Sequence, residues 1–349
     1  MPDARGVERV WFGDGAGARA ARLALRPLEA VYATAIRVRG ALYDAGVLAI
    51  HDPGIPSVSV GNLSVGGTGK TPVAAWVARA LRDRGAHPAI VLRGYGADEP
   101  LVHELLNPGI PVIAGADRVA GVTEARRRGA DVAVLDDAFQ HRRVRRAADI
   151  VLVSADRWDG RVRLLPAGPW RESLHALRRA SLVLVTRKAV SAEAAERVAM
   201  ALLRAVPGVA RATAHLAPAA LRRVGDPGGI RPLDGLAGVR VLALSAIGDP
   251  ASFRRQLEAQ GALVDGVAFP DHHAFTAAEV ARIARRAAAA GLVVCTLKDA
   301  VKLAPLWPRE APPLWYVSQR LDLERGAAEM DALLARVLGD RPPHIQPVG

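Results

Sequence analysis

Residues 55–76 read IPSVSVGNLSVGGTGKTPVAAW. An apolar run from Ile55 to Val60 leads into a loop with glycines at 61, 66, 67 and 69, and Lys70-Thr71 then begins a segment that can be helical. This order is typical of a phosphate-binding P-loop, because glycines let backbone N–H groups converge on phosphate oxygens while a lysine reaches the outer phosphates and a hydroxyl can ligate Mg²⁺. The stretch therefore predicts that the chain binds a nucleoside triphosphate.

The loop departs from the strict P-loop pattern at one position. The pattern G-x-x-x-x-G-K-[ST] would place glycine at 64, where this chain has Ser64. A glycine-rich turn between a strand and a helix, without a ligand, is the alternative interpretation.

Composition narrows the class of protein. The 349 residues can form two domains, and with half of them hydrophobic and 23% charged the chain is expected to be soluble and globular. The formal net charge of +12 could suit a nucleic acid, an anionic membrane or an acidic substrate, or it could come from solvated arginines, since only four lysines (70, 188, 298 and 302) contribute to it. Aromatic residues make up 4%, which disfavours a stacking platform for single-stranded nucleic acid. The single cysteine, Cys295, excludes an intrachain disulfide and a multi-cysteine zinc site and fits a reducing cytosol.

Residues 19–50 carry apolar side chains at near-helical spacing together with several arginines. The pattern predicts a basic amphipathic helix that lies either in a membrane interface or on the protein's own core. No run of eighteen apolar residues occurs, so we expect no transmembrane helix, and the acidic residues near the N-terminus do not suggest a signal peptide. The apolar positions are Leu23, Leu25, Leu28, Val31, Tyr32, Ala35, Ile36 and Leu42, and the arginines are Arg19, Arg22, Arg26, Arg37 and Arg39.

From Ile55 onward, strand-like and helical segments alternate. This alternation predicts an α/β fold of the P-loop NTPase type, a three-layer α/β/α arrangement with a mainly parallel sheet, and a second, smaller α/β domain across a cleft. The proline- and glycine-rich stretch around 217–235 indicates a hinge between them. The expected divisions are 1–50 (basic amphipathic helical segment), 51–215 (P-loop kinase-type domain), 216–235 (linker or hinge), 236–335 (second domain) and 336–349 (C-terminal tail).

Acidic residues follow two of the predicted strands. Asp136 and Asp137 end the hydrophobic run that starts at residue 131, a position at which P-loop enzymes orient Mg²⁺ or its waters. Asp98 and Glu99 follow another strand-like run, so Asp98 could take a proton from an acceptor hydroxyl and Glu99 could serve the metal. A solvated turn is the alternative for the second pair.

Two further motifs could contribute to a site. The rigid turn at 166–172 presents Arg171, which could neutralise phosphoryl charge, and Glu172, although a structural turn with an ion pair would look the same. The segment 269–273 reads FPDHH, in which one histidine could be a catalytic partner or both could be ordinary loop residues.

Taken together, these motifs resemble those of the tetraacyldisaccharide 4′-kinases of lipid A biosynthesis, and they span most of the chain. The matching stretches are VGN at 60–62, GGTGKTP at 66–72, RGYG at 93–96, DEP at 98–100, ADR at 116–118, DDAFQH at 136–141, PAGPWRE at 166–172, FPDHH at 269–273 and KDAVK at 298–302. The resemblance implies ATP-dependent phosphorylation of the 4′-hydroxyl of a tetraacylated glucosamine disaccharide 1-phosphate.

The resemblance also implies roles for particular residues. Asp98 would be the base, assisted by His272 across the cleft, while Lys70 and Arg171 would act on the phosphates. Thr71, Glu99 and Asp136 would serve Mg²⁺. The ATP phosphates would lie along Ser64, Val65, Gly66, Gly67, Thr68, Gly69, Lys70 and Thr71. Substrate-site or supporting residues would be Arg118, Asp137, Gln140, His141 and Glu172.

The resemblance further implies where the protein works. The lipid substrate and the N-terminal amphipathic segment would place it peripherally on the cytoplasmic face of the bacterial inner membrane, without nucleic acid and without an obligate protein partner. Only Ala97 separates the RGYG and DEP motifs, a shorter stretch than relatives usually have, and Ala138 stands where glycine is usual.

Two other function classes share some of these features. A P-loop nucleotide switch or metallochaperone-type GTPase would have the same loop and strand acids, but no Asn-Lys-x-Asp element for guanine is present. A nucleic-acid-dependent ATPase is favoured only by the net charge.

Overall fold

The computed structural model describes residues 4–94, 96, 98–226, 228–247, 250–270, 273–288 and 291–341. The chain forms two compact units. Unit 1 comprises residues 1–94, 107–216 and 321–349, and unit 2 comprises 95–106 and 217–320.

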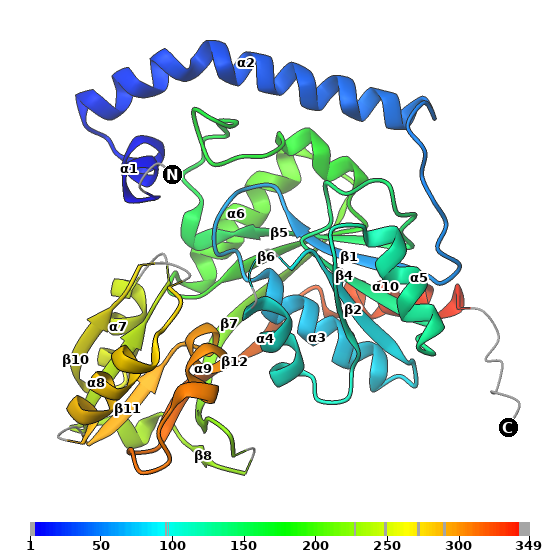
Figure 1. The fold of residues 1–349 in the computed structure, drawn as a ribbon. Coiled ribbons are helices and arrows are strands. Elements are labelled where there is room, and N and C mark those ends of the chain that lie inside the picture. Colours follow the sequence, from blue (N-terminus) through cyan, green and yellow to red (C-terminus); the bar gives the residue numbers. More distant parts are fainter. Residues whose placement is uncertain are drawn as a thin grey trace, which may run out of the picture. The chain divides into compact units, whose positions relative to one another are not determined.

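Unit 1 contains a parallel sheet, in which β1 to β7 pair with one another only in parallel (Figure 1). The strand order is β7-β6-β5-β1-β4-β2-β3. The topology places the P-loop strand, β1, in the middle of the sheet between β5 and β4. The strands are β1 Ser57–Asn62, β2 Pro88–Leu92, β3 Val112–Ala114, β4 Val132–Asp136, β5 Ala148–Ser154, β6 Leu182–Arg187 and β7 Ala210–Arg223.

Helices cover both faces of this sheet. Val58 and Val60 of β1 point to one face, where they pack with α3 (Lys70–Arg82) and α10 (Ala327–Gly339). Alternate residues of neighbouring strands point to the other face, where α5 (Arg118–Arg127) and α6 (Ala192–Ala205) cover them. The three layers confirm the predicted P-loop-type α/β fold.

Unit 2 is a smaller α/β unit with strands in the order β10-β9-β11-β12. These four strands pair with one another in parallel, whereas the short β8 pairs antiparallel with β7. Helices α7 and α8 pack on separate hydrophobic clusters. Helix α8 begins with a capping box made by Thr276 and Glu279. The elements are α4 Asp98–Leu106, β8 Ile230–Arg231, β9 Arg240–Ser245, α7 Pro250–Glu258, β10 Leu263–Ala268, α8 Ala277–Ala287, β11 Leu292–Cys295, α9 Leu297–Leu303 and β12 Leu314–Arg325.

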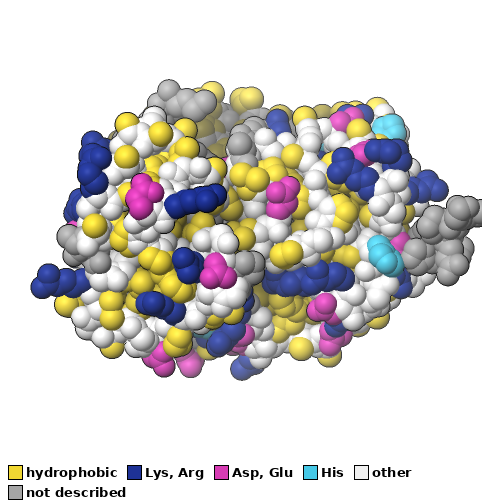
Figure 2. Space-filling model, turned by 60° about the horizontal axis from the view of Figure 1, so that its bottom comes forward, with side chains coloured by type: hydrophobic (Ala, Val, Ile, Leu, Met, Phe, Trp, Pro, Cys, Tyr) yellow, Lys and Arg dark blue, Asp and Glu magenta, His cyan; other side chains and the backbone are white. Residues whose placement is uncertain are grey.

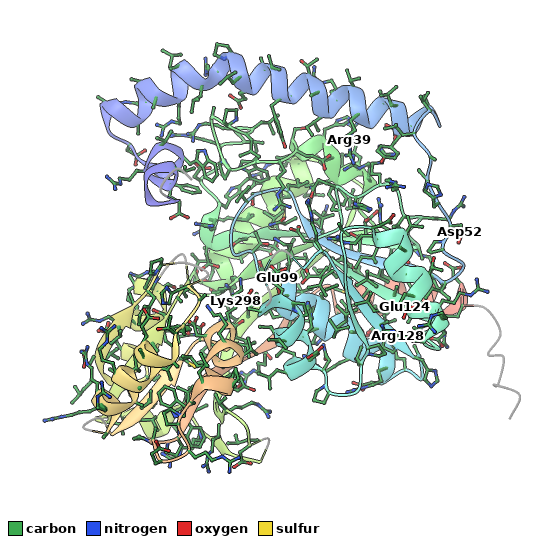
Figure 3. All side chains as sticks on the ribbon, in the orientation of Figure 1. Arg39, Asp52, Glu99, Glu124, Arg128 and Lys298 are labelled. Atoms are coloured by element: carbon green, nitrogen blue, oxygen red, sulfur yellow. The ribbon has the colours of Figure 1, made fainter. Side chains whose placement is uncertain are left out.

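The helices α1 (Ala4–Phe12) and α2 (Ala16–Asp44) belong to unit 1 and run along it (Figure 1). The side of α2 that faces the unit makes polar contacts with it: Tyr32 donates to the Arg171 carbonyl at 3.0 Å and Arg39 donates to the Gln140 carbonyl at 3.0 Å. Figure 3 shows Arg39 on that inward side. Among the described residues, none of the helices combines the length and the apolar character that crossing a membrane needs.

The chain passes from unit 1 to unit 2 between 216 and 217, close to the expected division at 215/216, but the other boundaries differ from those expected. Residues 217–223 are not an irregular linker, because β7 continues through them and Leu221 is buried. Residues 321–339 return to unit 1, since Met330, Leu334 and Val337 of α10 are buried against its sheet. The expected tail from 336 therefore begins inside a packed helix, and β7 and β12 each contribute to both units.

Charge is dispersed on the face drawn in Figure 2. Lysine and arginine side chains are interspersed there with acidic ones among apolar and uncharged groups. On that face, the net positive charge is not gathered into one continuous basic patch.

Candidate nucleotide and phosphoryl-transfer site

The loop 63–69 joins β1 to α3 and has the backbone of a phosphate-binding loop. Gly66 and Gly69 have φ angles of 114° and 90°, a region that favours glycine. Gly69 is also the N-cap of α3 and has no side chain to cap it, so the first N–H groups of the helix face the loop side without a capping side chain. Lys70 and Thr71 are the first two residues of α3. This geometry suits an anion at the helix start.

Buried hydrogen bonds fix the loop in this shape. The Asn62 amide donates to the Thr68 hydroxyl at 2.8 Å, and both residues are buried. The Thr186 hydroxyl donates to the Thr68 carbonyl at 2.9 Å, and the Gln140 amide donates to the Asn62 carbonyl at 2.9 Å. Thr68 therefore uses its side chain inside the protein, and the loop is held before any ligand binds.

The turn at 166–172 lies along the same loop. The Val65 N–H donates to the Pro169 carbonyl at 2.8 Å, and the Arg171 N–H donates to the Leu63 carbonyl at 2.6 Å. These backbone bonds bring the Arg171 side chain to the loop across more than a hundred residues of sequence.

Three charged side chains meet beside the loop. The Arg171 guanidinium donates to the two carboxylate oxygens of Asp137 at 2.9 and 3.2 Å, and the Lys70 ammonium lies 3.7 Å from one of them. Asp137 follows directly after β4 and has a φ angle of 52°, so the left-handed residue is Asp137 and not Ala138. The carboxylate thus holds both cations at the end of the central strand.

The metal candidates are divided between the units. Asp136 ends β4 and is 7% exposed, and it lies in unit 1 with Thr71. Glu99 lies in unit 2. Within the described ranges, no group of three or more histidine, cysteine, aspartate or glutamate side chains could hold a metal ion by itself.

Glu172 is buried and paired with a neighbouring arginine. Its carboxylate accepts from Arg179 at 2.8 Å, and the Arg179 guanidinium lies 4.7 Å from the centre of the Phe139 ring. Glu172 is the last residue of the turn and follows directly after Arg171.

Arg118 and His141 lie near each other at this edge of unit 1. Arg118 is 3% exposed and donates to the Gly115 carbonyl at 2.8 Å. Burial, together with the nearby Arg118, Arg143 and Arg146, lowers the pKa of His141 to about 4. His141 is therefore neutral at physiological pH.

Asp98 and Glu99 start helix α4 of unit 2, and Asp98 is 6% exposed. Helix α4 packs against α9, on which Lys298 lies (Figure 3). His272, the expected partner of Asp98, lies outside the described residues, as does Ala97.

The described neighbour of that histidine, His273, sits in an aromatic cluster. Its ring stacks on Phe269 with centroids 4.9 Å apart and meets Phe275 edge-on. Its carbonyl accepts from the Lys302 ammonium at 3.3 Å. Lys302 is in turn 2.9 Å from the fully buried Asp299. The segment that carries the predicted histidine is thus tied to the KDAVK motif.

The structure adds residues that the sequence did not indicate. Lys188, just after β6, donates to the Gly67 carbonyl of the loop at 3.4 Å. Asn62 and Thr186 hold the loop from inside. Asn62 stood within a motif and could have been noticed, whereas the positions of Thr186 and Lys188 had no local signal.

Known proteins of similar sequence belong to one family of kinases. The family model described as tetraacyldisaccharide-1-P 4′-kinase matches residues 21–338. A tetraacyldisaccharide 4′-kinase of Anaeromyxobacter dehalogenans (strain 2CP-C) is 41% identical, covering 95% of each chain. That of Geobacter metallireducens is 39% identical over 82% of this chain and 89% of its own.

A solved structure agrees with these relatives. The crystal structure of LpxK from Aquifex aeolicus in complex with ATP is 29% identical and covers 91% of this chain and 99% of its own, with a TM-score of 0.74. A P-loop fold with a loop held for phosphates is what such a kinase requires. This chain belongs to the tetraacyldisaccharide 4′-kinase family and is a phosphotransferase.

Proposed function

We propose that this protein transfers the γ-phosphoryl group of ATP to the 4′-hydroxyl of a tetraacylated glucosamine disaccharide 1-phosphate. The 4′-oxygen bonds to the γ-phosphorus as the bond to the β–γ bridging oxygen breaks, ADP leaves with that oxygen, and the hydroxyl proton passes to a base. The observation that carries the proposal is the glycine loop with Lys70 and Arg171 gathered at Asp137 beside it. Such transfer depends on positioning and on neutralising phosphate charge.

On the donor side, the N–H groups of the loop and of the α3 N-terminus bind the ATP phosphates, and Lys70 contacts the outer ones. Lys70 and Arg171 can turn from Asp137 to a phosphate, because Asp137 is partly exposed and the Lys70 contact is long. Thr71, Asp136 and Glu99 are the residues that would hold Mg²⁺, which supplies further charge neutralisation when bound. A hydroxyl and carboxylates, together with phosphate oxygens, are the ligands that Mg²⁺ prefers.

On the acceptor side, Asp98 takes the hydroxyl proton with His272 as its partner. Asp98 is the first residue of helix α4 and is 6% exposed. Arg118, Gln140, His141 and Glu172 would line or support the substrate site.

The kinase assay tests the reaction. Purified protein, Mg²⁺-ATP and the tetraacyl disaccharide 1-phosphate in detergent micelles should yield ADP and a product heavier by one phosphoryl group. ADP release without a phosphorylated lipid, under conditions that support a related kinase, would contradict the proposal.

The base is tested on helix α4 itself. Asp98→Asn should lower kcat by about 10²-fold or more while ATP affinity stays unchanged, because a base acts on the acceptor and not on ATP binding. Glu104→Gln, on an exposed position of the same helix, is the matched control and should keep full activity. Equal kcat values for the two variants would reject Asp98 as the base.

We also propose that α2 docks on the membrane that holds the lipid substrate. Tyr32 and Arg39 of this helix bond to unit 1, and several of its apolar side chains are exposed, among them Val31 at 67% and Leu23 at 64%. Exposed apolar side chains along one helix fit an interfacial helix. Other exposed apolar positions along this segment are Leu28, Val38, Leu42, Val47 and Ile50.

Vesicle flotation tests the docking. The protein should float with vesicles of anionic phospholipid, and Leu23→Ser with Val31→Ser should reduce the bound fraction. Ile230→Ser, at an exposed position on β8 of unit 2, is the control. Equal flotation of the α2 variant and the control would contradict docking through α2.

A further inference from the structure

Arg157 is a cation beside the P-loop to which neither the sequence nor the proposed reaction gives a role. It ends η1 (Ala155–Arg157), directly after β5, the strand that pairs with β1. A side chain at Gly66 would collide with Arg157 Nη1, so the guanidinium lies directly on the loop at this glycine. The group therefore approaches the loop that we propose binds the ATP phosphates.

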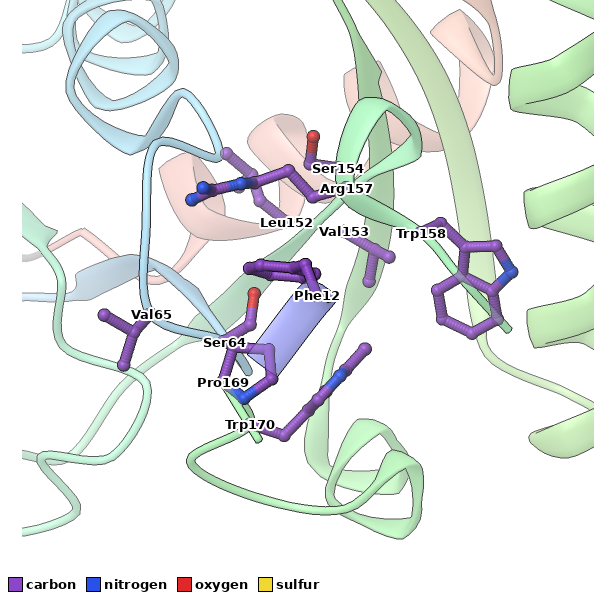
Figure 4. Close-up of a pocket in the computed structure, with 10 residues that line it drawn as sticks. All are labelled: Phe12, Ser64, Val65, Leu152, Val153, Ser154, Arg157, Trp158, Pro169 and Trp170. Atoms are coloured by element: carbon purple, nitrogen blue, oxygen red, sulfur yellow. The ribbon is translucent and has the colours of Figure 1, made fainter. Parts of the chain in front are cut away.

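An acidic side chain of the N-terminal helix holds Arg157. The Arg157 Nη2 atom is 2.5 Å from a Glu8 carboxylate oxygen, and the Arg157 guanidinium lies 5.4 Å from the centre of the Phe12 ring. Figure 4 shows Phe12 beside Arg157 in a pocket that Ser64 and Trp170 also line. Arg157 and Glu8 are 33% and 46% exposed, so another anion can replace the glutamate.

Helix α1 is fixed to the turn that lies on the loop. The Trp11 indole donates to the Pro166 carbonyl at 3.0 Å, and Arg163 donates to the Trp11 carbonyl at 3.2 Å. The same turn accepts from Val65 of the loop through Pro169. Helix α1, the turn and the P-loop thus form one packed group.

The backbone that carries Arg157 is also well supported. The neighbouring Asp156 accepts from the N–H groups of Lys188 and Ala189 at 2.7 and 2.8 Å. Lys188 in turn reaches the Gly67 carbonyl. Arg157 lies at Gly66 and Lys188 at Gly67, so two positive charges lie beside consecutive glycines of the loop. The hydrogen bonds of Asp156 fix the backbone that carries both residues.

We propose that Arg157 binds a phosphate oxygen of ATP at the Gly66 side of the loop, and that Glu8 competes with the nucleotide for the same guanidinium. The inference rests on the proposed function, because it names a further contact in that nucleotide site. Arginine binds phosphate through paired hydrogen bonds, and a triphosphate carries several negative charges against the single charge of Glu8. Helix α1 then lowers the affinity for ATP through one ion pair.

Calorimetric titration of the full chain with ATP, without acceptor, tests this coupling. Arg157→Ala should weaken ATP binding about tenfold, the effect of one lost charge-assisted hydrogen bond, and Arg157→Lys should weaken it less. Glu8→Gln should tighten binding about threefold, because the competitor is neutral while its shape remains. The double variant Glu8→Gln, Arg157→Ala should bind like Arg157→Ala alone.

Two control variants distinguish a contact at Gly66 from a general loss of positive charge and from a failed P-loop. Arg84 forms a similar exposed ion pair with Asp331 near the C-terminal end of α3, so Arg84→Ala should bind ATP like the parent chain. Lys70→Met should lose ATP binding; if it does not, the P-loop assignment fails and not the role of Arg157.

Two outcomes would overturn the proposal. One is ATP affinity unchanged in Arg157→Ala, and the other is tighter binding by Glu8→Gln that persists without Arg157. If Arg157→Ala does not fold, Glu8→Gln decides by itself, because unchanged ATP affinity in that variant overturns the competition.

Discussion

Two lysine–aspartate pairs, one in each unit, differ in how tightly they are held. Lys70 lies 3.7 Å from Asp137, whose side chain is 36% exposed and shared with Arg171. Lys302 lies 2.9 Å from Asp299, whose side chain is fully buried. Asp299 also accepts from the Ala246 N–H at 2.9 Å and from the Thr296 hydroxyl at 2.6 Å. The first pair can exchange its partner for a ligand, whereas the second is part of the framework.

The physical reason is the cost of removing charge from water. A partly exposed pair gains little from its own contact, so a phosphate can replace the carboxylate at small cost. A buried carboxylate must keep its cation and its hydrogen bonds, because an unpaired buried charge is strongly destabilising. The same two residue types therefore serve binding in unit 1 and structure in unit 2.

The largest expected effect, on catalysis, comes from the partly exposed Lys70–Asp137 pair. Lys70→Met should lower kcat/KM by about 10³-fold, because one charge that stabilises the transferring phosphoryl group is lost. The unfolding free energy should change by less than about 0.5 kcal/mol, since the contact is weak. Steady-state kinetics and urea unfolding of the same preparation measure both quantities. A large loss of stability in this variant would erase the contrast between the pairs.

Substitution in the buried Lys302–Asp299 pair should instead change stability. Lys302→Met should reduce the unfolding free energy by about 3 kcal/mol, because Asp299 is left buried without its cation. The double variant Lys302→Met, Asp299→Asn should recover most of this loss, since asparagine can still accept from the Ala246 N–H without a charge. Urea unfolding is the measurement. A single variant as stable as the parent chain would show that the pair is not structural.

A smaller effect is expected where the loop is held without charge. Thr68→Val keeps the shape of the side chain but removes the hydroxyl that accepts from Asn62. The unfolding free energy should fall by about 1–2 kcal/mol, because the Asn62 amide is left buried without this partner. ATP affinity should fall with it, as the loop loses its fixed shape. Stability and affinity equal to those of the parent chain would show that the bond does not hold the loop.

At neutral pH the smallest effect is expected from His141, because its protonation changes stability only at lower pH. Its pKa is about 4 when folded and near the ordinary 6.5 when unfolded, because it is half-buried and faces Arg118, Arg143 and Arg146, with Asp117 opposing them. The unfolded chain thus binds the extra proton between these values. The unfolding free energy should therefore be full above about pH 6.5 and decrease as the pH falls toward 4.

His141→Gln, which cannot be protonated, should flatten that part of the stability–pH curve. Thermal unfolding between pH 4 and 8 measures it, with His87→Gln, an exposed histidine of unit 1, as the control. If His141→Gln and the parent chain show the same slope, the lowered pKa of His141 is not the cause of the pH dependence.

Much of the fold could be predicted because it depends on local patterns. The alternation of apolar runs and helical segments predicted an α/β fold with a mainly parallel sheet, and the strand pairings confirm it. The long β7 was missed because its alternating, proline- and arginine-containing sequence looks like a hinge. The placement of α10 was missed because a C-terminal helix can pack on either unit, and only its buried apolar side shows which one.

Some residues of the candidate site could likewise be predicted from local motifs, and others could not. The P-loop and the acids after β4 are short contiguous motifs, and the chain that follows a parallel strand must appear at the same edge of the sheet. Lys188 contacts Gly67 of the loop, which is 121 residues away in the sequence. Arg157 contacts Glu8, which is 149 residues away. No local pattern encodes contacts over such distances.

The sequence by itself determined the α/β class, the nucleotide loop and the family, because those follow from the order and spacing of neighbouring residues. Only the tertiary structure decided which charges stand around the loop and how firmly each is held. The same Lys-and-Asp chemistry is loose at Asp137 and locked at Asp299, because burial and additional hydrogen bonds are properties of the packed chain and not of its residue types.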